Sequence, residues 1–121
     1  VAQKYGVSVI SLIAPTSEDR IKMIASEAEG FIYIVSSMGV TGVRSEIKTD
    51  IGHIMEAVKK YAKVPAAVGF GISKPEQAKK MADLSDGVIV GSAIVKLVAQ
   101  YGSDAPDHIY EYVKSMKDAI R

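Results

Sequence analysis

Four short apolar stretches rich in β-branched residues recur along this chain, and each is followed by a segment with helical periodicity. The apolar stretches cover residues 7–14, 31–35, 64–69 and 87–90, and the helical segments cover residues 17–29, 51–62, 77–84, 93–100 and 106–120. Short apolar runs with little alternation are typical of strands buried on both faces of a parallel sheet. The alternation of the two patterns predicts right-handed βαβ units in an α/β fold.

Local signals predict where the helices begin and end. Ser17 offers a capping hydroxyl ahead of two acidic residues, and Ser73 begins a capping box that has a proline in the first turn. Gly30 and Gly102 occupy positions where left-handed helix ends are expected.

The organisation of the chain predicts one structural unit over residues 1–121, because no linker or low-complexity stretch interrupts it. A sheet of four parallel strands leaves two edges unpaired unless a partner or more chain covers them. Two architectures therefore remain open, a small flavodoxin-like sheet and half of an eight-stranded barrel. The chain starts at Val1, and residues 1–6 read as the tail of a helix, so we expect a piece of a longer protein.

Charge and composition exclude several functional classes. The 15 Lys and Arg nearly balance the 14 Asp and Glu, which removes the electrostatic basis for binding nucleic acid or an anionic membrane. The sequence has no cysteine, so it has no disulfide, thiol nucleophile or thiolate metal site, and a reducing compartment is compatible with it. Its apolar runs are far shorter than the roughly 20 residues of a membrane-spanning helix.

The junctions that follow the strands are the places to look for a ligand site, since parallel α/β folds bind ligands beyond the carboxyl ends of their strands. The junction from Ser36 to about Asp50 is longer than usual, and long loops in compact domains tend to be functional. Gly71 and Gly91 each end a strand and lead into a helix start, where free amides and the helix dipole favour an anion. A tight turn explains each glycine alone, whereas the pair, with the Ser92 hydroxyl, favours a phosphate site.

Tyr33 is the other candidate side chain, because a tyrosine inside an apolar strand needs a partner for its hydroxyl. It is either a core tyrosine bonded to a backbone group or a residue of the site. No acid pair and no Ser–His–Asp set falls on the strand ends, so the site lacks its own catalyst.

Five motifs taken together resemble the tryptophan synthase alpha chain family. They are ISLIAPT (10–16), GFIYIVS (30–36), GVTG (39–42), GFGIS (69–73) and GSAIVK (91–96). Their order and spacing agree with the family over nearly all 121 residues, whereas GFGIS alone would be weak evidence.

The resemblance implies a (β/α)8 TIM barrel about twice this length, of which this chain would be a four-stranded half-barrel holding strands five to eight. It also implies a lyase that cleaves indole-3-glycerol phosphate to indole and glyceraldehyde 3-phosphate by acid–base catalysis. The expected partner is the tryptophan synthase beta chain, in an α2β2 assembly. Pyridoxal phosphate would be bound only by that beta chain, this chain would need no cofactor or metal, and the expected location is the cytoplasm.

Site residues follow from the resemblance position by position. The phosphate-binding positions would be Gly42, Phe70, Gly71, Ile72, Gly91 and Ser92, and the indole pocket would be lined by Ile13, Tyr33, Phe70 and Ile89. Tyr33 and Thr41 would support the catalytic acids, with Thr41 on a mobile loop. The family's catalytic glutamate and aspartate lie in the first half of the barrel, so we expect negligible lyase activity from these 121 residues.

Two other interpretations remain open. The isolated chain could act as a non-catalytic phosphate-binding half-barrel or a self-associating interaction module that covers its own edges. It could also derive from another phosphate-binding barrel enzyme of the tryptophan or histidine pathways, although the GVTG loop argues against that.

Overall fold

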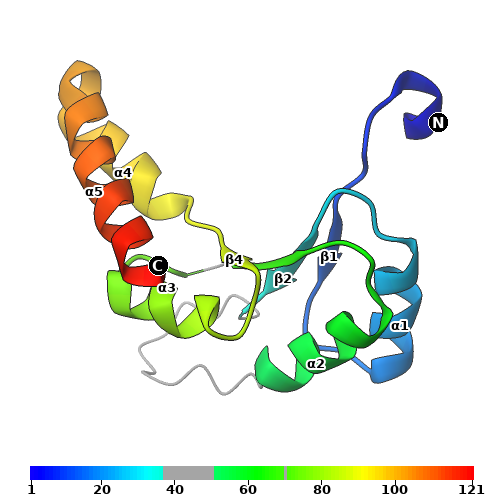
Figure 1. Ribbon diagram of the computed structural model, residues 1–121. Coiled ribbons are helices and arrows are strands. Elements are labelled where there is room, and N and C mark those ends of the chain that lie inside the picture. The colour runs from blue at the N-terminus through cyan, green and yellow to red at the C-terminus, as the bar shows by residue number, and fades with distance from the viewer. Residues whose placement is uncertain (37–50, 70) are drawn as a thin grey trace.

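The computed structural model describes residues 1–36, 51–69 and 71–121, and in them four parallel strands alternate with helices (Figure 1). The strands are β1 (Ser11–Ile13), β2 (Ile32–Val35), β3 (Ala66–Gly69) and β4 (Gly87–Val88). The helices are α1 (Glu18–Glu27), α2 (Ile51–Tyr61), α3 (Pro75–Ala82), α4 (Ser92–Tyr101) and α5 (Ala105–Ile120), with short 3-10 turns η1 (Ala2–Tyr5) and η2 (Gly102–Asp104). The predicted α/β order is confirmed.

The sheet has the order β1-β2-β3-β4, so neighbours in sequence are neighbours in space. One row of paired residues crosses it from Ile13 through Ile34 and Val68 to Val88, and the first three of these side chains are completely buried. Successive residues of a strand point to opposite faces. This row therefore marks the face that packs against the helices and forms the core.

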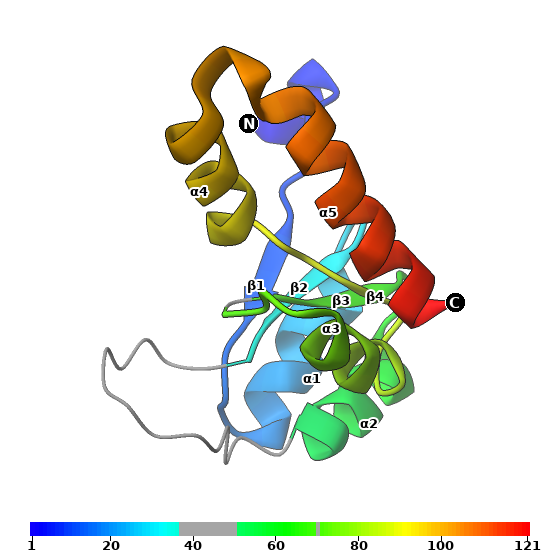
Figure 2. The ribbon, with the colours of Figure 1, turned by 90° about the vertical axis from the view of Figure 1, so that its left-hand side faces the viewer.

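The helices cover that face unevenly. Helices α1, α2 and α3 lie beneath the sheet in Figure 1, and their apolar side chains join the core, with Ile21, Met55 and Met81 among the buried ones. Helix α5 packs on α3, and α4 packs on α5. The α4–α5 pair rises beyond β4 as an arm, while the N-terminal segment rises on the β1 side (Figures 1 and 2).

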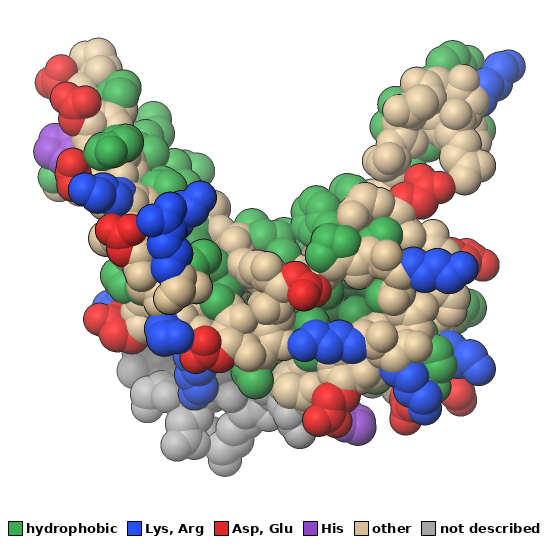
Figure 3. All heavy atoms as spheres, viewed as in Figure 1, with side chains coloured by type: hydrophobic (Ala, Val, Ile, Leu, Met, Phe, Trp, Pro, Cys, Tyr) green, Lys and Arg blue, Asp and Glu red, His purple; other side chains and the backbone are tan. Residues whose placement is uncertain are grey.

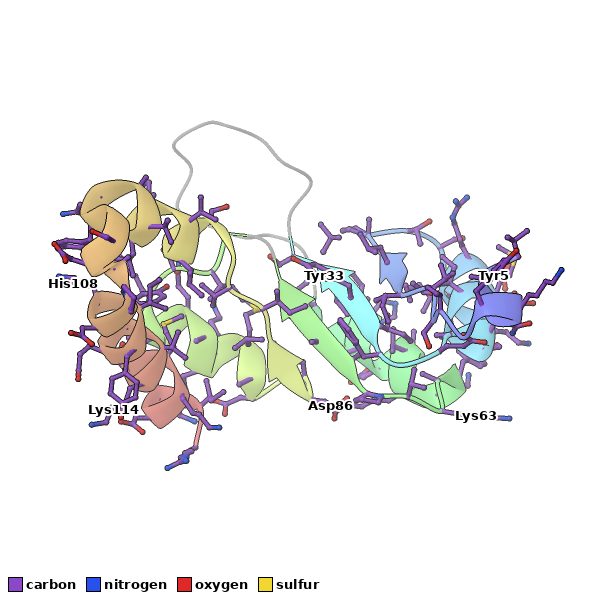
Figure 4. All side chains as sticks on the ribbon, turned by 90° about the horizontal axis from the view of Figure 1, so that it is seen from above. Tyr5, Tyr33, Lys63, Asp86, His108 and Lys114 are labelled. Atoms are coloured by element: carbon purple, nitrogen blue, oxygen red, sulfur yellow. The ribbon has the colours of Figure 1, made fainter. Side chains whose placement is uncertain are left out.

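The opposite face of the sheet carries a second row of paired residues, Leu12, Tyr33, Ala67 and Gly87. Among the described residues no helix covers this row, and Figure 4, seen from above, looks directly onto the strands. We call this row, with Val35 and Gly69, the open face. Leu12 is 59% exposed there.

Both edge strands are shorter than predicted. The stretch 7–14 forms a strand only from Ser11, and Val7 and Val9 are more than half exposed. β1 pairs only with β2, and the chain before β2 turns away at Gly30, whose φ of 69° lies in the left-handed region. The stretch 87–90 is a strand over two residues, although the Ile89 amide still donates to the Val68 carbonyl at 2.8 Å.

The helix ends also differ in detail from the prediction. Helix α3 has its N-cap at Lys74, and Gln77 Oε1 accepts the backbone amides of Ser73 and Lys74 at 3.0 and 3.1 Å, so the expected Ser73 cap is displaced by one residue. Ser17 is the N-cap of α1 but makes no side-chain capping bond. Gly102 is the C-cap of α4, as predicted, but its φ of 54° and ψ of −123° are not those of the expected left-handed helix end. Gly30, with φ 69°, lies two residues beyond the α1 cap. No helix in the described ranges is long and apolar enough to cross a membrane.

Candidate functional site at the carboxyl ends of the strands

The turns after β3 and β4 leave the sheet side by side. Val68 and Val88 are paired in parallel, and the Ile89 amide extends the pairing by one bond. The segments that carry Gly71 and Gly91 therefore start from adjacent strand ends at the same edge of the sheet. This adjacency is what the spacing of the two glycines predicts.

The turn after β3 is exposed at Gly71 and buried at the next residue, Ile72. Gly71 has φ 78°, a conformation that residues with side chains rarely adopt. Apart from its chain neighbours, no described residue places an atom within 4 Å of the position that a Cβ would take. Ile72 is 6% exposed and belongs to the core. Gln77 already occupies the amides of Ser73 and Lys74, so the start of α3 does not offer those two donors to a ligand.

A helix start with unblocked amides follows β4. Gly91 is the N-cap of α4, and its carbonyl accepts the amides of Ile94 and Val95 at 2.9 and 3.1 Å, which closes the first turn. Gly91 and Ser92 are exposed, and the first turn has no acidic residue. Among the residues that the structure describes, none but the chain neighbours has an atom within 4 Å of a Cβ built on Gly91. The first amides of a helix have no partner within the helix and lie at its positive dipole end. Helix starts of this kind are favourable places for an anion in proteins generally.

Tyr33 projects from the open face toward the carboxyl edge. A Cβ built on Gly69 would lie 2.2 Å from the Tyr33 hydroxyl, so the ring lies over this glycine. Figure 4 shows Tyr33 toward the carboxyl ends of the strands and Asp86 at their amino ends, where Asp86 precedes β4 and accepts the Ala66 amide at 2.9 Å. Tyr33 is half-buried and makes no hydrogen bond with any other described residue. The alternative of a core tyrosine bonded to the backbone gains no support from these residues.

Ser36 is a site-supporting residue that the sequence reasoning missed. Its side chain is completely buried, and both its hydroxyl and its amide donate to the Gly69 carbonyl, at 2.8 and 3.1 Å. These two bonds join the ends of β2 and β3 and fix the backbone beneath the Tyr33 ring. A serine directly after an apolar strand was the only signal in the sequence.

The two isoleucines predicted for the indole pocket lie in different places. Ile89 follows β4, is half-buried and, by the alternation of the strand, faces the same side as Tyr33. Ile13 is 0% exposed and packs in the core on the helix-covered face, opposite Ile34. The structure therefore groups Ile89 with Tyr33 and places Ile13 apart from both.

Three predicted site residues lie outside the described residues. They are Thr41, Gly42 and Phe70. The long junction after β2 likewise falls on residues 37–50. Among the residues that the structure describes, no group of three or more His, Asp or Glu side chains could hold a metal ion.

One tyrosine on α5 ties this helix to the Gly71 turn. Tyr112 Oη donates to the Ser73 carbonyl at 2.8 Å, and partial burial raises the pKa of its phenol above the usual value. Helix α5 thereby supports the segment between Gly71 and α3.

A parallel sheet with helices on one face, an open face opposite and βα turns gathered at one edge defines one half of a (β/α)8 barrel. A family model described as "Tryptophan synthase alpha chain" matches residues 1–121. The chain belongs to the tryptophan synthase alpha chain family.

Individual relatives agree with this assignment. The chain is 50% identical over 120 residues to the tryptophan synthase alpha chain of Lacticaseibacillus casei and 49% identical over 121 residues to that of a Thermoanaerobacter strain. These matches cover 99% and 98% of this chain but 45% and 46% of the relatives, so the chain spans about half their length.

Solved structures also match nearly all of this chain with about half of their own length. The chain matches a structure titled as the tryptophan synthase α2β2 complex of Pyrococcus furiosus with a TM-score of 0.79 and 34% identity, covering 97% of this chain and 48% of that one. It matches the tryptophan synthase alpha subunit of Campylobacter jejuni with a TM-score of 0.72 and 32% identity, covering 98% and 44%. The predicted half-barrel architecture is confirmed.

Proposed function

We propose that this chain supplies the phosphate-binding half of a tryptophan synthase alpha chain, a lyase that cleaves indole-3-glycerol phosphate to indole and glyceraldehyde 3-phosphate. The observation that carries the proposal is the adjacency of the Gly71 and Gly91 turns at one edge of the sheet, next to the unblocked start of α4. In barrels of this class a phosphate commonly lies between the loops after the seventh and eighth strands.

The phosphate would be held mainly by backbone amides. Gly71 and Gly91 leave room for close approach, because no side chain from the described ranges fills the space beside them. Ser92 adds a hydroxyl at the positive end of α4, and Ile72 anchors its turn in the core. Gly42 and Phe70 would complete this subsite.

The indole end of the substrate would lie along the open face. Tyr33 and Ile89 face that side, and Phe70 is a third position assigned to the pocket. Ile13, the fourth assigned position, packs in the core on the helix-covered face, so we do not place it against the indole. Tyr33, together with Thr41, would support the catalytic acids of the complete barrel. The reaction needs a base for a proton of the glycerol chain and an acid for the indole carbon, hence two positioned carboxyl groups.

The phosphate subsite is tested by titrating the isotope-labelled chain with glycerol 3-phosphate and following its amide resonances. We expect the amides of Gly71, Gly91 and Ser92 to shift together with one saturation curve. Gly102 is the internal control, since it is also an exposed glycine with positive φ but lies at the far end of α4. Unchanged resonances at Gly71 and Gly91 would overturn the proposal.

The isolated chain would bind phosphate without catalysing the reaction. A phosphate cradle orients the substrate, which accelerates the reaction only if the reacting end meets the acid and the base. Incubation with indole-3-glycerol phosphate should release no indole above the uncatalysed background. Turnover near that of intact family members would show that these 121 residues hold a complete active site.

The complete protein would work with a beta chain in the cytoplasm. One of the matched structures is titled as an α2β2 complex, which supports this partner. Pyridoxal phosphate would belong to the beta chain, and this chain would use no cofactor, metal, nucleic acid or membrane.

A further inference from the structure

We propose that Tyr112 of α5 is a positioning residue for the phosphate subsite, because its hydrogen bond to the Ser73 carbonyl fixes the segment that carries Gly71. This role rests on the proposed function, since it concerns the same subsite, and it adds a side chain of the last helix to the two glycine turns. Tyr112 would touch neither the substrate nor the reacting atoms, and it would act through the backbone of Ser73.

The peptide group between Ser73 and Lys74 is held by two helices. Its carbonyl, on Ser73, accepts the Tyr112 hydroxyl at 2.8 Å, and its amide, on Lys74, donates to Gln77 Oε1 at 3.1 Å. Gln77 Oε1 also accepts the Ser73 amide at 3.0 Å. The first contact comes from α5 and the others come from α3, which packs against α5. The rotation of this peptide group is therefore restricted at both of its ends.

Gly71 depends on this anchor because little else restrains it. It is exposed, its φ is 78°, and glycine has more conformational freedom than any other residue. The next residue, Ile72, is anchored in the core by its side chain, and Ser73 is anchored by its backbone. Loss of the Tyr112 bond would let the segment after Gly71 rotate, and the amides of this turn would then point at a phosphate for a smaller fraction of the time.

The ring of Tyr112 lies beside the other half of the subsite. It lines one apolar groove together with Val90 and Ile94, and the Ile94 amide donates to the Gly91 carbonyl at 2.9 Å in the first turn of α4. Helix α4 packs on α5, and α5 packs on α3 (Figure 1). Helix α5 therefore contacts the elements that follow both turns, and it helps to set how far apart the Gly71 and Gly91 amides lie.

The charges around this region make the orientation of the amides important. On the face seen in Figure 3, basic and acidic side chains are intermixed over α3 and over the α4–α5 arm. A surface of mixed charge gives a phosphate little general attraction. Hydrogen bonds from oriented backbone amides would then supply much of the affinity, so a residue that orients them affects binding without touching the ligand.

The test measures the dissociation constant of glycerol 3-phosphate in the complete protein that contains these residues, so that the rest of the barrel is in place. Tyr112→Phe removes the hydroxyl and keeps the ring. We expect this variant to bind about threefold to tenfold more weakly, the effect of losing one hydrogen bond that holds the binding conformation. At saturation its Gly71 amide resonance should shift less than in the unchanged protein, whereas the Gly91 and Ser92 resonances should shift fully.

Ser85→Ala is the matched control for a lost hydroxyl. The Ser85 hydroxyl donates to the carbonyls of Met81 and Gly87 at 2.7 and 2.8 Å, at the end of α3 that is remote from Ser73. The affinity of this variant for glycerol 3-phosphate should equal that of the unchanged protein. Indole, which has no phosphate, separates positioning from a general loss of structure, and all three proteins should bind it equally.

Equal affinity of Tyr112→Phe and the unchanged protein for glycerol 3-phosphate would overturn the role of Tyr112 and leave the proposed function standing. An equal loss of affinity in Ser85→Ala, or weaker binding of indole by Tyr112→Phe, would also refute it, because the effect would then be a general loss of structure. Resonances of Gly71 and Gly91 that do not respond in the unchanged protein would overturn the proposed function and the role of Tyr112 together.

Discussion

A side chain at position 69 would enter the space that the Tyr33 ring fills, with its Cβ 2.2 Å from the hydroxyl. The glycine of this motif is thus explained by a neighbour 36 positions earlier in the sequence and not by its own backbone. The hydroxyl and the amide of Ser36 both donate hydrogen bonds to the carbonyl of the same glycine. Gly69 on β3 and Ser36 just after β2 therefore position the Tyr33 ring at the carboxyl edge.

Gly69→Ala should destabilise the chain by about 1–3 kcal/mol, the usual cost of inserting a methyl group where no space exists. The free energy of unfolding in urea measures the loss. In a Tyr33→Ala background the same change should cost much less, because the clashing ring is gone. Gly87→Ala is the matched control, since a Cβ there meets the Ala67 Cβ at an ordinary 3.8 Å. Equal costs for the two glycine changes would contradict this explanation.

A second prediction at the residue scale concerns Tyr112 and the dependence of folding stability on pH. Burial raises the pKa of its phenol, so the folded state favours the neutral form. The contribution of this shift to the free energy of unfolding is present in full below the pKa of about 10 that tyrosine has in the unfolded chain. It is lost as the pH rises through the higher pKa that Tyr112 has in the folded chain. Tyr112→Phe should lower stability near neutral pH by about 1 kcal/mol, through the lost bond to the Ser73 carbonyl.

The same variant should also flatten the alkaline fall in melting temperature, followed by circular dichroism from about pH 9 to 11. Tyr110→Phe is the control on the same helix, because Tyr110 is 64% exposed. An identical alkaline profile for the unchanged chain and for Tyr112→Phe would show that Tyr112 does not titrate in this way.

At the scale of single elements, one substitution at the start of α4 should change helix stability and phosphate binding in opposite directions. Its first turn is free of acidic residues and is the proposed phosphate subsite. Ser92→Asp should stabilise the helix by about 0.3–1 kcal/mol, because a carboxylate is favourable at the positive end of the dipole. It should also weaken glycerol 3-phosphate binding by about tenfold or more, since like charges then meet.

Thermal unfolding and calorimetric titration measure these two effects of Ser92→Asp separately. Ser103→Asp, which lies in η2 beyond the end of α4, is the control for added charge. Loss of both stability and binding would indicate local unfolding of the helix start, against the proposed electrostatic effect.

The sequence predicted which elements form, and it predicted their ends less well. The four apolar runs and the amphipathic helices follow from periodicity, which is a local property. The length of β1 is set by its neighbour, because β2 begins only after the turn at Gly30. The contact of Tyr33 with Gly69, the Ser36 bonds and the burial of Ile13 all depend on strand register, which no single stretch of sequence specifies.

At the scale of the whole molecule, the strand order β1-β2-β3-β4 has a consequence for how such a sheet can be extended. Each βα unit pairs with the units just before and just after it, as the modules of a solenoid do. A sheet built in this way is extended by adding a unit at either edge, without rethreading any strand already in place. The curvature of the sheet then determines the number of units at which the sheet closes into a barrel, because at that number the last strand lies beside the first.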